Sequence, residues 1–198
     1  MIKTIFFDFG RVISGNHNSW DGMHKRIKEE TGLTAEELDK IFQKHWEDIS
    51  VNKESETDFL KEVATHAKKE VSVNQLADMF AADTKIDSNV IEIMRNLRDK
   101  GLRIVILANE SKIGEETRLK KIADVVDEIY SSATLRLRKP DPAIYKFVLR
   151  KEKLTPDEAL FIDDKERNTV AAEALGIKTI LYKNPAQLKE ELKKYLKN

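Results

Sequence analysis

Three short apolar runs in this chain each lead to a side chain that can bind a cation or a phosphate. Residues 4–7 lead to Asp8, residues 103–107 lead to Asn109, and residues 160–162 lead to the pair Asp163-Asp164. Because the carboxyl ends of parallel strands share one edge of an α/β sheet, where such folds bind ligands, we expect these side chains to meet. Neighbouring carboxylates repel one another, so the cluster indicates a cation, and all-oxygen ligation suits Mg²⁺.

The remaining apolar pattern predicts an α/β fold with a doubly wound parallel sheet. Five runs are short, apolar and bounded by polar residues, as in buried strands: 4–7, 103–107, 160–162, 178–182 and, more weakly, 127–132. Amphipathic segments of helical period alternate with the later runs: 88–100, 112–123, 141–152, 165–175 and 185–197. Such alternation predicts right-handed crossovers, with helices on both faces of the sheet.

Residues 15–84 break this alternation, because they contain helical patterns and no convincing strand. The helices are expected at about 20–31, 35–49, 56–69 and 73–82, with Gly32 and residues 51–55 as breaks. We therefore predict an all-helical cap at 15–84, inserted into a catalytic core made of residues 1–14 and 85–198.

Composition excludes several classes of protein. The chain has 198 residues, with 35 basic and 35 acidic side chains that cancel, so nothing indicates binding to nucleic acid or to an anionic membrane. It has no cysteine, which excludes disulfides, thiolate metal sites and cysteine nucleophiles. The N-terminal apolar run is too short for a signal peptide, and no segment approaches the length of a membrane span. We expect a cytoplasmic protein; its oligomeric state is not predicted.

Four motifs in order resemble the haloacid dehalogenase superfamily, and most of all its small phosphatases with a helical cap, such as glucose-1-phosphate phosphatases and the phosphatase domain of soluble epoxide hydrolases. The motifs are Phe7-Asp8-Phe9-Gly10-Arg11-Val12-Ile13, Ile106-Leu107-Ala108-Asn109, Arg138-Lys139-Pro140-Asp141-Pro142 and Phe161-Ile162-Asp163-Asp164. The resemblance implies a Rossmann-like sheet of strand order 5-4-1-2-3, one Mg²⁺ and an aspartyl-phosphate intermediate.

The same resemblance implies a role for each site residue. Asp8 is expected to be the nucleophile and, with the Gly10 carbonyl and Asp164, a Mg²⁺ ligand. Lys139 is expected to neutralise phosphate charge and to pair with Asp163. The expected phosphate-binding residues are Gly10, Asn109 and Lys139. We expect Asp163 and Asn168 to hold these residues in position without binding the phosphate themselves.

Two positions depart from the family pattern. Gly10 stands where the family usually has a second aspartate, which serves as general acid and base, and such catalysis is typically worth about 10²–10⁴-fold. Ala108 stands where a serine or threonine usually binds the phosphoryl group. Ser111 could replace the lost hydroxyl, and His17 or Glu110 could supply the missing acid.

The resulting hypothesis is a Mg²⁺-dependent phosphomonoesterase that acts on a small phosphorylated metabolite, with sugar phosphates as the first expectation. Gly10 and Ala108 keep open a catalytically weak or inactive protein with a binding or regulatory role. A haloacid dehalogenase is a further alternative, but the paired acids argue against it. Trp20 and Trp46 are interpreted as packed between cap helices, and the alternative for Trp20 is that it lines the substrate pocket.

Overall fold

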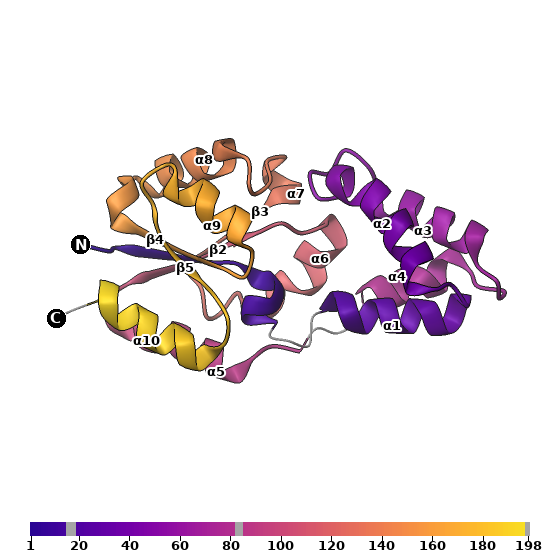
Figure 1. Ribbon diagram of the computed structural model, residues 1–198, viewed down its shortest axis with the longest axis horizontal. Coiled ribbons are helices and arrows are strands. Elements are labelled where there is room, and N and C mark those ends of the chain that lie inside the picture. Colours follow the sequence, from indigo (N-terminus) through magenta and orange to yellow (C-terminus); the bar gives the residue numbers. More distant parts are fainter. Residues whose placement is uncertain (15–18, 82–84, 197–198) are drawn as a thin grey trace.

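A five-stranded parallel sheet forms the centre of the molecule (Figure 1). The computed structural model describes residues 1–14, 19–81 and 85–196, with the backbone alone for residues 19–21. The strands are β1 (Thr4–Phe7), β2 (Arg103–Ala108), β3 (Glu128–Ser131), β4 (Ala159–Asp163) and β5 (Lys178–Leu181). Their order is β3-β2-β1-β4-β5, which is the predicted order 5-4-1-2-3 counted from the other edge, so this prediction is confirmed.

Helices cover both faces of the sheet, as the doubly wound prediction requires. Helices α5 (Ser88–Asp99) and α10 (Pro185–Tyr195) lie on one face, and α8 (Pro142–Glu152) and α9 (Glu166–Glu173) lie on the other (Figure 1). Successive strand residues point to opposite faces. Phe7 accordingly packs in a cluster with Met94 of α5 and Leu188 of α10, whereas Phe6 packs with Val148 of α8. A central strand that is buried on both sides explains why three of its four residues, Ile5, Phe6 and Phe7, are apolar.

One predicted helix and several short segments differ from the sequence analysis. The expected helix 112–123 is two pieces, α6 (Lys112–Thr117) and the single turn η2 (Leu119–Ile122). Arg118 lies at the break, and its side chain bonds to tertiary partners that the helical pattern does not encode. Two further short segments were not predicted as helical, α7 (Ser132–Leu135) and η3 (Pro156–Glu158). The segment η1 (Phe9–Ile13) is an irregular turn, because Gly10 and Arg11 have non-helical backbone angles.

Four helices form a separate helical layer beyond the carboxyl edge of the sheet (Figure 1). They are α1 (Ser19–Thr31), α2 (Ala35–Ile49), α3 (Glu56–His66) and α4 (Val73–Ala81). The layer has its own core, in which Ile27, Leu38, Phe59 and Leu76 are all buried. We refer to α1–α4 as the cap. The division at residues 15 and 84 stays a prediction, because both junctions fall on residues outside those described.

Polar contacts hold the cap against the core. Ser132 Oγ donates to the Ser50 carbonyl at 2.5 Å, and the Arg138 guanidinium lies 3.0 Å from the Glu47 carboxylate. The main-chain N–H of Ile113 donates to Glu56 Oε1 at 2.7 Å. These contacts orient the cap over the edge at which the strands end. Within the described part of the chain, no helix combines the length and the apolar character needed to cross a bilayer.

Candidate active site

The end of β1 and the turn that follows it place Asp8 at the carboxyl edge of the sheet. The Asp8 N–H donates to the Ile162 carbonyl of β4 at 2.8 Å, which anchors the residue beside the acidic pair. The chain then reverses at Arg11, whose φ of 61° is unusual for a residue with a side chain. The Arg11 N–H donates to Ser14 Oγ at 2.9 Å and so stabilises this turn.

Lys139 links the two acidic segments inside the protein. Its Nζ donates to Asp8 Oδ1 at 2.6 Å and to Asp163 Oδ2 at 2.8 Å. All three residues are buried, with exposed fractions of 1% for Lys139, 7% for Asp8 and 0% for Asp163. Burial by itself would lower the pKa of Lys139, but the charges of Asp163 and Asp8 outweigh burial and raise it. Burial raises the pKa of Asp8 to about 7, against the opposing effect of Lys139.

Asp163 has its hydrogen-bonding capacity filled by the protein. Besides Lys139, its carboxylate accepts from the Lys165 N–H at 2.8 Å and from Asn168 Nδ2 at 3.0 and 2.9 Å. The Asn168 carbonyl accepts from Tyr145 Oη at 2.9 Å, so this residue is held in turn. The expectation that Asp163 pairs with Lys139 agrees with this geometry, and Asn168 lies behind Asp163.

Asp164 has the opposite character, since Oδ1 of its carboxylate is buried and has no hydrogen-bond partner. One carboxylate oxygen from each of Asp8, Asp163 and Asp164 lies within 4.8 Å of the others. Burial, together with the Asp163 charge, raises the pKa of Asp164. An unsatisfied buried carboxylate oxygen beside two further carboxylates fits a hard divalent cation, which prefers oxygen ligands. The residues present therefore fit Mg²⁺.

Asn109 and its neighbours occupy the end of β2. The Asn109 side chain accepts from the Lys139 N–H and donates to the Lys139 carbonyl, both at 2.8 Å, so it orients the lysine segment. Ala108 is buried at the strand end. Ser111 is fully buried, and its Oγ accepts from the Gly114 N–H, which makes it the N-cap of α6. That capping role argues against Ser111 as a substitute for the missing phosphoryl-binding hydroxyl.

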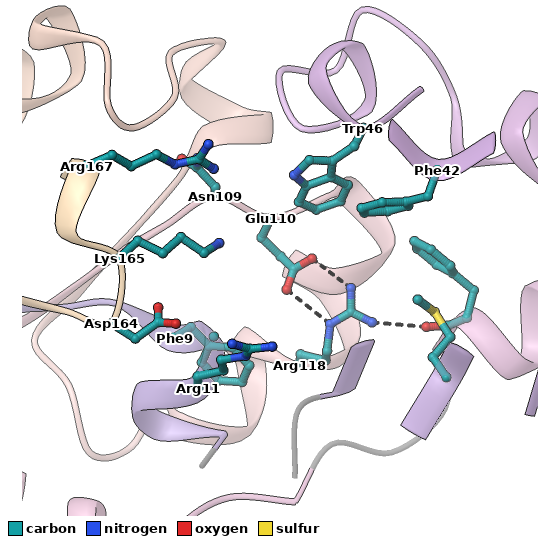
Figure 2. Close-up of a pocket in the computed structure, with 13 residues that line it drawn as sticks. Phe9, Arg11, Phe42, Trp46, Asn109, Glu110, Arg118, Asp164, Lys165 and Arg167 are labelled. Atoms are coloured by element: carbon teal, nitrogen blue, oxygen red, sulfur yellow. Dashed lines mark hydrogen bonds and ion pairs between the residues drawn. The ribbon is translucent and has the colours of Figure 1, made fainter. Parts of the chain in front are cut away.

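A pocket of about 360 Å³ opens between this edge and the cap (Figure 2). Gly10, Asn109 and Asp164 are among its lining residues. Phe42 and Trp46 stand on the cap side, and Arg11, Lys165 and Arg167 reach in from the core side (Figure 2). The pocket therefore has a charged end at the acidic cluster and an apolar end at the cap.

A buried ion pair in this pocket was not predicted from the sequence. Arg118 Nη2 donates to Glu110 Oε1 at 2.7 Å and Nε donates to Oε2 at 3.1 Å (Figure 2). A third N–H of Arg118 donates to the Phe80 carbonyl of the cap at 3.0 Å. Glu110 is therefore held as the partner of Arg118, which argues against its use as the missing acid. His17 and the Trp20 side chain lie outside the described residues.

Trp46 lines the pocket, in addition to packing within the cap as predicted. Its ring stacks on Phe42 with centroids 4.9 Å apart and an angle of 26° between the ring planes. The helical spacing of the two aromatic residues on α2 was visible in the sequence. Which side of this helix would face the acidic edge was not visible, because the docking of the cap decides it.

The strand order, the helices on both faces and the acidic cluster at the carboxyl edge of the sheet define a protein of the Rossmann-like α/β class. Residues 5–182 match the family model described as haloacid dehalogenase-like hydrolase, so the chain belongs to that family. The expected resemblance is thereby confirmed, and the chain is that of an enzyme of the hydrolase class.

Individual relatives are moderately similar in sequence. D-ribitol-5-phosphate phosphatase of Bacteroides thetaiotaomicron is 26% identical over 97% of this chain and 97% of its own length. The sesquiterpene phosphatase astK of Aspergillus oryzae is 24% identical over 88% of this chain and 87% of its length. Bifunctional epoxide hydrolase 2 of Rattus norvegicus is 28% identical over 62% of this chain, but the match spans only 23% of that longer protein.

Solved structures share the fold. A haloacid dehalogenase family enzyme from Bacteroides thetaiotaomicron, solved as the wild-type protein with magnesium and inorganic phosphate, has a TM-score of 0.74. It is 24% identical, and the match covers 92% of this chain and 95% of that one. A HAD-like hydrolase from Porphyromonas gingivalis has a TM-score of 0.78 at 23% identity, with 100% and 99% covered.

Proposed function

We propose that this hydrolase is a Mg²⁺-dependent phosphomonoesterase that transfers the phosphoryl group to Asp8 and then to water. The single observation that carries the proposal is the convergence of Asp8, Asp163 and Asp164 around the buried Lys139, with one Asp164 oxygen left unsatisfied. Relatives named as phosphatases, and a structural neighbour solved with magnesium and phosphate, support the same reaction class.

Asp8 is the proposed nucleophile. Its Oδ1 is bound to Lys139, whereas Oδ2 faces Gly10, where an added Cβ would lie 3.7 Å away. A carboxylate oxygen of Asp8 forms the new bond to phosphorus while the bond from phosphorus to the ester oxygen breaks, and the leaving alkoxide takes a proton from water. Water then attacks the aspartyl phosphate, which releases inorganic phosphate and regenerates Asp8.

Asp8, the Gly10 carbonyl and Asp164 are the proposed Mg²⁺ ligands. Asp163 is a poorer candidate, because Lys139, Asn168 and the Lys165 N–H already fill its carboxylate. When bound, the cation supplies charge neutralisation between the phosphate and the anionic nucleophile.

Lys139 is proposed to act on both partners of the reaction. Its ammonium holds Asp8 in place and offers positive charge to a phosphoryl oxygen next to it. Asn109 fixes the main chain of Lys139 through two hydrogen bonds. We therefore propose that Asn109 contributes to phosphate binding chiefly by orienting Lys139. Gly10 is proposed to contribute its main chain alone.

The test is release of inorganic phosphate from p-nitrophenyl phosphate, with and without Mg²⁺, by the wild type and by Asp8→Asn. We expect turnover that requires Mg²⁺ and falls by at least about 10³-fold in the variant, because the nucleophile is lost. A brief acid quench of the wild type should trap phosphate on the protein, and Asp8→Asn should trap none. Tight Mg²⁺ binding without turnover on any phosphate ester would instead favour the binding or regulatory role.

A further inference from the structure

On the cap side, the described residues that line the pocket are apolar apart from the indole N–H of Trp46. Of the described lining residues, the cap contributes Met23 from α1, Phe42 and Trp46 from α2, and Phe80 from α4. The Phe42 ring also meets Phe59 of the cap core edge-on, with centroids 5.9 Å apart. We call these four lining residues, three of which are aromatic, the aromatic wall. Because the cap core supports it from behind, the wall is a fixed apolar surface.

The polar pair between the wall and the acidic edge is satisfied within the protein. Arg118 uses three N–H groups on Glu110 and on the Phe80 carbonyl. Glu110 Oε1 also accepts from the Ser111 N–H at 2.9 Å. Three of the five N–H groups of Arg118 and three acceptor positions of Glu110 are therefore used within the protein, which leaves the pair less hydrogen-bonding capacity for the hydroxyl groups of a ligand.

The uncommitted polar side chains lie at the opposite end of the pocket. Among the residues that the structure describes, Arg11, Lys165 and Arg167 form no ion pair and no side-chain hydrogen bond. Arg11 lies in η1 after β1, Lys165 precedes α9, and Arg167 lies in the first turn of α9, all next to the acidic cluster (Figure 2). They provide positive charge where the phosphate would bind. The core end of the pocket thus has side chains that can bind an anion, whereas the cap end is apolar.

We infer that the preferred substrates are phosphate esters of apolar alcohols, rather than of sugars or other polyols. The inference rests on the proposed function, which orients the phosphate toward Asp8 and therefore the leaving group toward the aromatic wall. An apolar leaving group gains affinity from this contact. A polyol has to bury hydroxyl groups against Met23, Phe42 and Phe80, which offer them no side-chain partner.

Cyclohexylmethyl phosphate and glucose 6-phosphate provide a matched test. Both present a phosphorylated primary alcohol on a saturated six-membered ring, so ring polarity is the main difference between them. For the wild type with Mg²⁺, we expect kcat/KM to be at least about tenfold higher for cyclohexylmethyl phosphate. Equal values, or a preference for glucose 6-phosphate, would overturn the inference.

A substitution in the aromatic wall tests whether the wall causes the preference for the apolar ester. In Trp46→Gln, the ratio of the two kcat/KM values should fall by at least about tenfold, mainly through the apolar ester. Phe147→Ala is the matched control, since Phe147 is a partly buried aromatic residue of α8 and does not line the pocket. An unchanged ratio in a folded Trp46→Gln protein would contradict the role of the wall.

Binding to Asp8→Asn separates this inference from the proposed reaction. Calorimetry with Mg²⁺ present should show tighter binding of cyclohexylmethyl phosphate than of glucose 6-phosphate, by about tenfold. If neither ester is hydrolysed by the wild type, the proposed function fails while this binding preference still decides the ligand class. If both are hydrolysed but bind with equal affinity, the reaction stands and the preference for apolar esters is wrong.

Discussion

Breaking the ion pair between Glu110 and Arg118 should cost several kcal/mol, because both side chains are buried. Their exposed fractions are 9% and 6%, so removal of the guanidinium leaves a carboxylate that water cannot readily solvate. Arg118→Met also removes two charge-assisted hydrogen bonds of 2.7 and 3.1 Å, each worth about 1.5–3 kcal/mol. We therefore expect the free energy of unfolding to fall by about 3–5 kcal/mol.

The chain contains an exposed pair of the same length that serves as a control. Lys193 Nζ lies 2.7 Å from Glu190 Oε1, as Arg118 Nη2 does from Glu110 Oε1, but its side chains are 70% and 69% exposed. Lys193→Met should change the free energy of unfolding by less than about 0.5 kcal/mol.

Urea unfolding followed by circular dichroism measures both variants. The double variant Glu110→Gln/Arg118→Met should recover part of the loss, because no uncompensated charge is then left buried. A loss below about 1 kcal/mol in Arg118→Met, or one equal to that of Lys193→Met, would refute the argument from burial.

Three further predictions concern the acidic edge. Gly10 has φ −64° and ψ 126°, which any residue can adopt, and an added Cβ would meet only Asp8 Oδ2, at 3.7 Å. Gly10→Asp should therefore fold and raise kcat by about 10²-fold. Gly10→Asn, the control without a titratable acid, should not raise kcat. Steady-state kinetics checks this, and equal rates for the two variants would exclude the missing acid as the cause of slow turnover. Asn168→Leu removes the amide that donates to both oxygens of Asp163, so urea unfolding should show a loss of about 1–3 kcal/mol; no measurable change would mean that the amide does not support Asp163. Ser111→Ala removes the N-cap of α6 and should lower stability by about 1 kcal/mol with kcat unchanged, whereas a large fall in kcat would show that the hydroxyl acts on the phosphoryl group.

Much of the sheet was predictable because buried parallel strands have a local signature. Each of the five runs is apolar and short, and each observed strand lies within one or two residues of its predicted bounds. Gly101 and Gly176, which follow helices, have φ values of 82° and 83°, the left-handed conformation that glycine adopts readily at helix ends. The break in the helix at Arg118 was not predicted. The Arg118 side chain bonds to Glu110, eight residues earlier, and to the Phe80 carbonyl of the cap, and a local helical pattern does not encode such contacts.

For the acidic edge, sequence alone determined which residues meet. The carboxyl ends of parallel strands lie at one edge of the sheet. The positions of Asp8, Asn109 and the pair Asp163-Asp164 after predicted strands were therefore enough to predict that these residues meet. The tertiary structure decided how they divide their roles, because hydrogen bonds filled Asp163 and left one oxygen of Asp164 unsatisfied.

The character of the pocket was decided by tertiary structure alone. Helical periodicity shows that α2 has an apolar face, but packing determines how much of that face the cap core covers and how much remains to line a cavity. The docking of the cap places Phe42 and Trp46 opposite the acidic edge and sets Arg118 between the two layers. These are contacts between separate layers of the fold, and no local pattern in the chain specifies them.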